Sequence, residues 1–508
     1  MPPVLAAVLC LACSGALLVW DARHRRDVST AVWIPTLWLF VLGSRPLSQW
    51  LNPGAPVNYA ADALLEGSPT DRWFFLALIV AAFAVLVRRR LSLAQFASRN
   101  AWFVVFMAYC LVSVVWSDYP FVSFKRWFKG LGDPLIVLVL LSERHPAAAI
   151  MTVLRRCAFV LLPLSVVFIK YFPELGRVYS GWTGVAYFTG VTTNKNLLGY
   201  LLFVYGLLFV CTLTQRHPFE SQLRRHGETV VSLVFLGIIA WLFIVADSKT
   251  PLVALLVAGT IAIMVTFAFV RAHIGLITAV LLLVAWAMLG SELGNSVVAA
   301  LGRDPSLTGR TDLWAAVLPM APNPLVGAGF ESFWLGPRLA VLWEQFAFRP
   351  NQAHNGYIDI YLNLGLVGVA LFAGFLFAAF RAVRHALLDN YAAPMGASPE
   401  SRVVARWGIG YVIAMLVYNI TEATFKPLNF LFILFLLVTL QSRSLSVKSK
   451  VFAPAGKMLR RGGVASRHRD APFTASVRSV VRPTPSPTER LQSPRKRRSL
   501  RLAQRRTL

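Results

Sequence analysis

The sequence predicts an all-α polytopic membrane protein, because both its composition and its long apolar runs differ from those of soluble proteins. Of the 508 residues, 56% are hydrophobic and only 14% are charged, whereas about a quarter of the residues of a soluble domain are charged. The runs approach the ~20 apolar residues that a helix needs to cross a bilayer. A membrane-spanning β-barrel would need short alternating strands, which these runs do not provide.

Thirteen apolar segments are candidate spans, and we expect 12 or 13 transmembrane helices. The first segment has no basic residue before it and DARHRR after it. This charge order is the reverse of that of a cleaved signal peptide and predicts a retained helix. The candidate spans are residues 4–20, 30–44, 73–87, 101–116, 133–142, 157–170, 197–214, 229–246, 252–270, 274–290, 356–380, 407–424 and 428–441.

The distribution of basic residues predicts that the N-terminus lies outside the cytoplasm. Lys and Arg collect on the cytoplasmic side of membrane proteins. With this orientation, 36 of the 50 Lys and Arg residues fall on the inner side, 18 of them in the C-terminal tail. The short loops show the same bias when the tail is left out.

The chain divides into a predicted transmembrane catalytic domain, residues 1–440, and a basic tail, residues 441–508. The tail contains 18 Lys and Arg residues against two acidic residues, and it is rich in Ser and Pro. This composition predicts a disordered cytoplasmic segment. Its basic stretch PRKRRSLRLAQRR could bind nucleic acid, but beside a membrane span we expect it to lie against anionic lipid.

One long loop between spans, residues 291–355, is predicted on the outer side. Its composition is not that of a disordered segment, since Thr308 is a plausible helix N-cap and Asp312 would lie in the first turn. An apolar stripe at helical spacing follows. Three prolines then end the helix, and two glycines allow a tight turn. We expect short helices that lie on the membrane surface. The stripe, the prolines and the glycines are Trp314, Val317 and Leu318; Pro319, Pro322 and Pro324; and Gly327 and Gly329.

Several cations fall beside span ends on the predicted outer side. Lys195 and Asn196 begin one span, Lys249 lies in a five-residue link between two spans, and Arg310 lies in the long loop. A further segment alternates cations with aromatic residues. Together with helix N-termini, such cations suit a lipid-linked diphosphate. Taken alone, each of these residues could instead have no binding role, with a long side chain that lies along the apolar surface and places its charge at the membrane interface. The further segment contains Lys125, Arg126 and Lys129.

The segment AHNGY places His354 where the long loop joins a span. A neutral imidazole can take a proton from an attacking hydroxyl. Asn355 could fix a sugar or a backbone group, and Gly356 would allow another chain segment to approach closely. The simpler alternative is a histidine that caps its own helix. Glu422 lies near the outer end of a span, where an acid is costly and is a functional candidate, unless it only pairs with Lys426.

The order of these motifs resembles that of the O-antigen ligase and Wzy-type polymerase family. TGRTDLW, NPLVGAGF and AHNGY carry the family resemblance, and TNKN, DSKT and NITEATF are similar to ExoQ-like exopolysaccharide polymerases. The resemblance covers about residues 116–441. It implies a GT-C-type membrane glycosyltransferase that uses undecaprenyl-diphosphate-linked sugars outside the cytoplasm and needs no metal or other cofactor. His354 would act as the base-like residue and Arg310 would contact the diphosphate. Lys249 stands where the ligases usually have arginine.

The prediction from the sequence is therefore a polymerase of undecaprenyl-diphosphate-linked repeat units in exopolysaccharide or O-antigen synthesis. Two alternatives remain open: a ligase that transfers the glycan to lipid A core or protein, and a polysaccharide transporter or flippase. The expected location is the bacterial cytoplasmic membrane, with chain-length regulator and flippase proteins as partners and no nucleic acid. The residues predicted for this function are His354 as catalytic residue; Arg310, Lys249, Lys195 and Arg126 as diphosphate ligands; and Asn355, Asn196 and Glu422 in support.

Overall fold

The structure is a computed structural model that describes residues 1–24, 28–53, 68–179, 184–215, 222–288, 291, 310–392 and 398–441. The basic tail beyond Gln441 lies outside these residues, as does the predicted N-cap Thr308 with most of the first part of the long loop. The predictions for these segments stay predictions.

Almost all regular structure in the described residues is helical, with one short antiparallel hairpin that pairs Arg177 with Phe188. The elements are α1 (Pro3–His24), η1 (Thr30–Val32), α2 (Trp33–Leu42), α3 (Leu47–Leu51), α5 (Pro69–Arg88), α6 (Leu93–Arg99), α7 (Ala101–Val112), η2 (Ser113–Trp116), α8 (Pro120–Gly130), α9 (Gly132–Leu141), α10 (Pro146–Tyr171), α11 (Pro173–Gly176), β1 (Arg177–Tyr179), β2 (Ala186–Phe188), α12 (Lys195–Leu213), α13 (Gln222–Ala246), α14 (Lys249–Met264), α15 (Ala268–Met288), α17 (Arg310–Val317), η3 (Leu318–Met320), α18 (Gly336–Gln345), α19 (Gly356–Ala392), α20 (Pro399–Tyr418) and α21 (Phe430–Thr439).

The fold class predicted from the sequence is confirmed, since each of the thirteen apolar segments overlaps a helix. Among the residues described, seven helices are long and apolar enough to cross a membrane. An eighth span results if the pair Leu93–Arg99 and Ala101–Trp116, bent by 101°, counts as one. That number is below the 12 or 13 predicted, because several apolar helices, such as α14 and α21, are shorter than a bilayer is thick.

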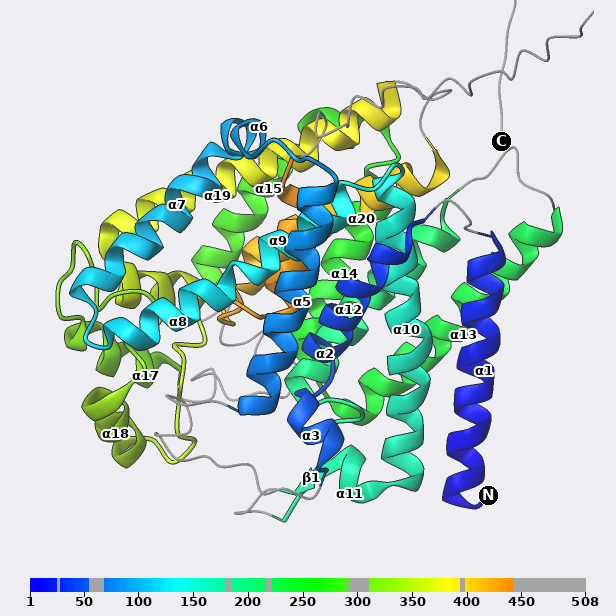
Figure 1. The fold of residues 1–508 in the computed structure, drawn as a ribbon, viewed down its shortest axis with the longest axis horizontal. Helices are drawn as coiled ribbons and strands as arrows, with labels where there is room; N and C mark the ends of the chain where they lie inside the picture. Colours follow the sequence, from blue (N-terminus) through cyan, green and yellow to red (C-terminus); the bar gives the residue numbers. More distant parts are fainter. Residues whose placement is uncertain are drawn as a thin grey trace, which may run out of the picture. The chain divides into compact units, whose positions relative to one another are not determined.

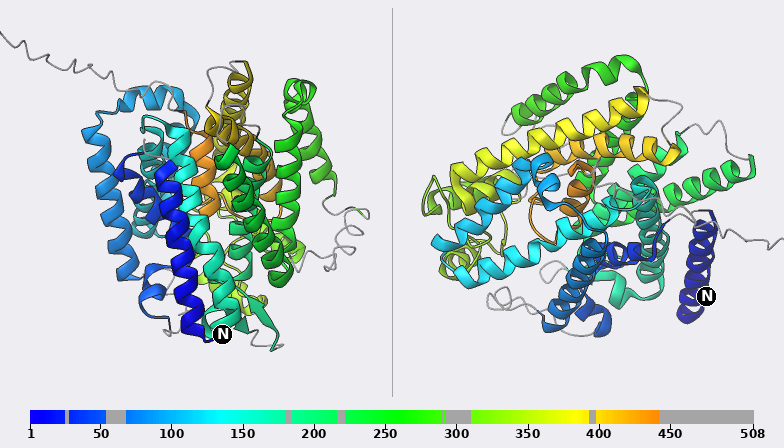
Figure 2. Two further views of the ribbon diagram at one scale, coloured as in Figure 1. Left: turned by 90° about the vertical axis from the view of Figure 1, so that its right-hand side faces the viewer. Right: turned by 45° about the horizontal axis from the view of Figure 1, so that its top comes forward.

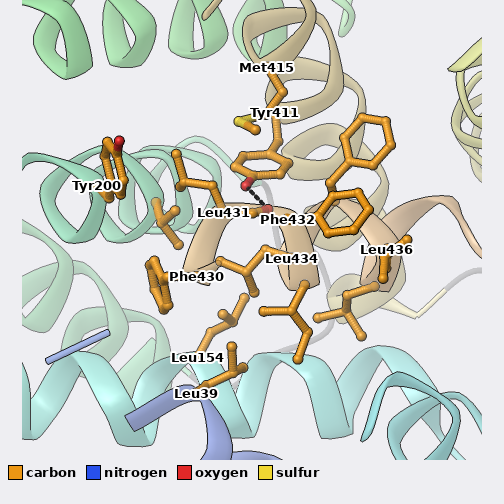
Figure 3. Packing of buried hydrophobic residues seen from close by; sticks show 14 of the residues in the cluster. Leu39, Leu154, Tyr200, Tyr411, Met415, Phe430, Leu431, Phe432, Leu434 and Leu436 are labelled. Carbon is orange, nitrogen blue, oxygen red and sulfur yellow. Dashed lines mark hydrogen bonds between the residues drawn. The ribbon is translucent and has the colours of Figure 1, made fainter. Parts of the chain in front are cut away.

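The core of the bundle lies around α10, α12, α20 and α21, and the outer helices surround it (Figures 1 and 2). α21 is apolar on all sides, as expected for a helix buried within other helices. Figure 3 shows its side chains against Leu39, Leu154 and Tyr411 of three other helices. The Tyr411 hydroxyl donates a hydrogen bond of 2.6 Å to the carbonyl of Leu431, which satisfies its polar atom inside the core.

The segments predicted on the outer side gather at one end of the bundle, and those predicted inside gather at the other. Contacts at the first end join Gly130 with Pro427, Gly199 with Ser248, and Gly356 with Asn419. Contacts at the second end join Arg89 with Glu143, and Arg406 with Thr214. These contacts agree with successive spans that run in opposite directions, and the prediction of which end faces the cytoplasm stays a prediction.

Helix α19 is interrupted near its beginning by Gly365, whose φ of 63° and ψ of −167° are not helical. Residues 323–330, here called the plug loop, fill the interruption. Backbone groups freed inside a membrane need such partners. The plug loop supplies four hydrogen bonds: Ala328 N to Leu362 O (3.0 Å), Gly329 N to Asn363 O (2.8 Å), Leu366 N to Pro324 O (2.9 Å) and Val367 N to Leu325 O (3.1 Å).

The described part of the long loop contains the predicted short helices α17 and α18, and Gly327 and Gly329 have the positive φ expected of a tight turn. These helices pack around a small apolar cluster of their own, with Leu313 and Phe333 fully buried. One detail of the predicted stripe is wrong. Leu318 is 42% exposed, because α17 ends at Val317 and the chain turns there into η3.

Candidate active site

The structure brings three predicted residues into direct contact around the carboxylate of Glu422. Its Oε1 accepts a hydrogen bond of 2.9 Å from Arg310 Nη2, and its Oε2 lies 3.6 Å from His354 Nδ1. A second terminal nitrogen of Arg310 donates to the carbonyl of Thr421. The side chain of Glu422 is only 4% exposed, whereas that of His354 is 24% exposed. Arg310 and Glu422 are thus largely buried, and the imidazole of His354 is the part of this group that is most accessible.

The charge on Glu422 is maintained by its neighbours. Burial acts to raise the pKa of its carboxyl, but His354 and Arg310 together outweigh burial and hold that pKa below its ordinary value. Oε2 has no hydrogen-bond partner within the described residues. An anionic oxygen therefore faces the Nδ1 side of the imidazole, and it stabilises the positive charge that the ring gains when it takes up a proton.

The lowered pKa of Glu422 predicts how stability depends on pH. A carboxyl whose pKa is lower in the folded state contributes stability above its unfolded pKa of about 4.3, and loses it as the pH falls through the folded value. We expect the difference in Tm between the wild type and Glu422→Gln, measured in detergent, to shrink below about pH 4. A difference that stays constant down to pH 3 would contradict this electrostatic account.

His354 is held in a backbone conformation that most residues avoid, with φ of 50°. The preceding residue, Ala353, is fixed on both sides. Its N–H donates to Asp359 Oδ1 at 2.9 Å, and its carbonyl accepts from Trp314 Nε1 at 2.7 Å. Left-handed residues of this kind cost about 1–3 kcal/mol and cluster at functional sites. The contacts around Ala353 offset that cost and fix the direction of the imidazole.

Asn355 and Gly356 have the backbone roles considered in the sequence analysis. The Asn355 side chain caps α19 by accepting from the N–H groups of Tyr357 (3.0 Å) and Ile358 (3.1 Å), so Asn355 and not His354 is the capping residue. A Cβ on Gly356 would lie 2.5 Å from Asn419 Oδ1. The close approach predicted for Gly356 is therefore confirmed, and it joins the start of α19 to the turn that carries Glu422.

Helix α17 supplies two contacts one turn apart, at positions i and i+4. Arg310 contacts Thr421 and Glu422, while Trp314 holds the carbonyl of Ala353. Such residues lie on the same face of a helix. One face of α17 thus forms hydrogen bonds both to the turn that contains Glu422 and to the residue before His354.

The other predicted cations do not contact this group directly. Lys195 and Asn196 lie in the first turn of α12, and Lys195 Nζ lies 4.6 Å from the Tyr187 ring centroid. Lys249 begins α14, with Nζ 3.7 Å from Asp247 and a side chain that is 37% exposed. Both helix starts are linked to the site. A Cβ on Gly199 of α12 would lie 2.6 Å from Ser248 Oγ, and the next residue of α12 packs edge to face on Tyr418.

Arg126 belongs to a different cluster, where it donates a hydrogen bond of 2.5 Å to the carbonyl of Glu331. Glu331 lines a small cavity of about 40 Å³ together with Gly356, Asp359 and Lys426, and the aromatic residues Phe330 and Phe425 line it as well. Glu331 also has a positive φ, of 54°. A second residue with a left-handed backbone thus lies beside a cavity that includes Gly356, two residues after His354.

The pairing of Glu422 with Lys426, left open from the sequence, is not found. Lys426 Nζ instead donates 2.5 Å to Gln352 Oε1, and Gln352 Nε2 lies 3.4 Å from His354 Nδ1. The reason is that α20 ends at Tyr418, earlier than predicted, and the turn after it directs Glu422 toward Arg310.

Gln352, Asp359 and Glu331 were not among the predicted site residues. Gln352 and Asp359 flank the AHNGY segment at distances of two and five residues from His354, and this proximity was the available signal. Glu331 carries no such signal, because only the folding of the plug loop onto α19 brings it near.

Fold and site define a polytopic helical membrane protein with a charged group held by the segment that precedes α19. Residues 231–373 match the family model described as O-Antigen ligase. The chain is 26% identical over 353 residues to the exopolysaccharide production protein ExoQ of Rhizobium meliloti strain 1021, covering 65% of this chain and 74% of the relative. The resemblance inferred from the motifs is thereby confirmed. Lys249, Arg310 and His354 fall inside the matched segment, and Glu422 falls outside it.

Proposed function

We propose that this protein is a membrane glycosyltransferase that polymerises undecaprenyl-diphosphate-linked oligosaccharide units for an exopolysaccharide or O-antigen. The contact of Glu422 with both His354 and Arg310 carries the proposal, because it places a partly exposed proton acceptor against a buried carboxylate. The resemblance to ExoQ, an exopolysaccharide production protein, supports the choice of polymerase.

The proposed reaction is displacement at the anomeric carbon of the donor glycan. The hydroxyl oxygen of the acceptor unit forms a new bond to that carbon, and the bond from the carbon to the diphosphate oxygen breaks, with its electron pair leaving on the lipid diphosphate. The imidazole of His354 takes the hydroxyl proton. The resulting imidazolium is stabilised by Glu422, 3.6 Å from Nδ1.

We assign the cations two roles. Lys249 and Lys195, which lie at helix N-termini, would stabilise the diphosphate as its negative charge develops. Arg310 remains a candidate ligand, but both its terminal nitrogens already contact the protein. A direct diphosphate contact through them would require those bonds to break, so we give Arg310 the role of holding Glu422 in place.

Replacing Lys249 with Ala is expected to raise the KM for the lipid-linked donor by about tenfold or more, since a charged hydrogen bond contributes about 1.5–3 kcal/mol. The kcat should fall as well, because the negative charge on the leaving diphosphate grows in the transition state, and Lys249→Arg should restore part of both constants. Initial rates against donor concentration measure both constants. Lys170→Ala removes an exposed cation that lies over the Trp241 ring and is the matched control. Equal effects of Lys249→Ala and Lys170→Ala would contradict the assignment.

Purified protein incubated with one defined lipid-linked repeat unit tests the proposed function. A polymerase produces a ladder of longer lipid-linked glycans and releases lipid diphosphate. A ligase, favoured by the description of the matching family model, leaves the donor unchanged until a lipid A core or protein acceptor is added. Growth only after addition of such an acceptor would refute the polymerase.

The proposed location is the bacterial cytoplasmic membrane, with the His354 end of the bundle outside the cytoplasm. The charge distribution supports this orientation. Thiol labelling of Asn351→Cys, an exposed position three residues from His354, tests it in intact cells with a membrane-impermeant reagent. Protection from the reagent until the cells are permeabilised would overturn the orientation. We also propose that the protein works together with chain-length regulator and flippase proteins.

A further inference from the structure

A second and larger cavity, of about 420 Å³, lies at the end of the bundle away from His354. It is formed where α9, α19 and α21 end and α10 and α20 begin. Its walls are largely apolar and include Ala147, Ala386, Gly408 and Val438, and polar groups such as those of Asn390 and Ser401 line it as well.

The cavity is separate from the candidate active site. Helix α20 lines it from Ser401 to Gly408, whereas the turn that carries Glu422 follows the other end of the same helix. Gly408, the lining residue of α20 nearest to that turn, precedes Tyr418 by ten residues, which at 1.5 Å per residue corresponds to about 15 Å along the axis. A ligand here would therefore not contact the reacting atoms.

The surroundings of the cavity are predominantly basic. Arg144 and His145, both exposed, directly precede the lining residue Pro146. The acid next to them, Glu143, is already paired with Arg89. Basic residues thus outnumber the remaining acids close to the lining. The basic residues are Arg144, His145, Arg384, His385 and Arg402, and the acids are Asp389 and Glu400.

Apolar walls that end among cations match an amphiphile with a negative head group. A neutral lipid would gain nothing from these cations, and a soluble anion would gain nothing from the apolar walls.

We propose that this cavity binds an anionic phospholipid. An acyl chain lies between α10, α19, α20 and α21, and the phosphate lies among the basic residues around Arg144. This inference is independent of the proposed function, because it uses neither His354 nor the diphosphate ligands.

The test uses the full-length protein, purified in detergent and exchanged against vesicles of phosphatidylglycerol or phosphatidylcholine, with bound lipid measured by native mass spectrometry. A Cβ on Gly408 would lie 3.4 Å from Val438 Cβ, so Gly408→Leu fills the cavity beside this residue. Gly237→Leu is the matched control, because a Cβ there meets open space. We expect the wild type and Gly237→Leu to retain phosphatidylglycerol at least tenfold better than phosphatidylcholine, and Gly408→Leu to lose this retention.

A second variant keeps the test decisive if Gly408→Leu does not fold. Arg144→Gln with His145→Gln changes two exposed side chains and should weaken the preference for the anionic lipid. Equal retention of both lipids by the wild type would overturn the proposal. So would unchanged retention in the folded variants, or retention of an isoprenoid lipid in place of phospholipid.

Discussion

Replacing His354 with Ala is expected to lower the rate of glycan polymerisation by about 10²–10⁴-fold, the range contributed by a positioned general base. The protein should still fold, because the His354 side chain is partly exposed and lies outside both apolar clusters. The rate is measured with purified protein at saturating donor, and the amount of folded protein by size-exclusion chromatography.

Two variants sharpen this prediction. Glu422→Gln keeps the shape of the side chain but removes the charge, so the rate should fall and its pH profile should change while donor KM stays similar. His273→Ala removes an exposed histidine of α15 that lies against Phe269 and should leave the rate unchanged. A His354→Ala protein that makes long polymer at the wild-type rate would remove His354 from the mechanism.

Gly365→Ala is expected to cause the largest loss of folded protein. The added Cβ would lie 2.3 Å from the backbone carbonyl of Leu325 in the plug loop, and backbone cannot move aside as a side chain can. A positive φ at a non-glycine residue adds about 1–3 kcal/mol. The thermal midpoint in detergent and the folded yield should both fall.

The matched control for Gly365→Ala is Gly259→Ala in α14. A Cβ on Gly259 meets nothing within 4 Å, and replacing a helical glycine with alanine adds about 0.5–1 kcal/mol of stability. If Gly365→Ala unfolds at the same temperature as the wild type, the interruption of α19 does not depend on glycine.

The sequence predicted the fold class and the helices well, because run length and hydrophobicity are local properties. Among the described residues, fewer helices reach the length of a full span than the 12 or 13 helices predicted, because a short apolar helix such as α21 has the composition of a span although it is buried among other helices. The sequence also could not show the bend between α6 and α7 or the interruption at Gly365, since both depend on packing with distant segments.

The candidate site was predicted in part. His354, Arg310 and Glu422 were named from motif and position, and they do lie together. Their pairing was not predictable, because it depends on where α20 ends and on how α17 is oriented. That Lys195 and Lys249 begin helices is a local feature that the sequence shows. The distance of their ammonium groups from His354 depends on how the whole bundle packs and was not predictable.

The interruption of α19 has a mechanical consequence. The plug loop is hydrogen-bonded to α19 on both sides of Gly365, through Leu362 and Asn363 before it and through Leu366 and Val367 after it. It therefore splints the two parts of the helix, so that the first part, which begins two residues after His354, keeps a fixed direction relative to the longer part.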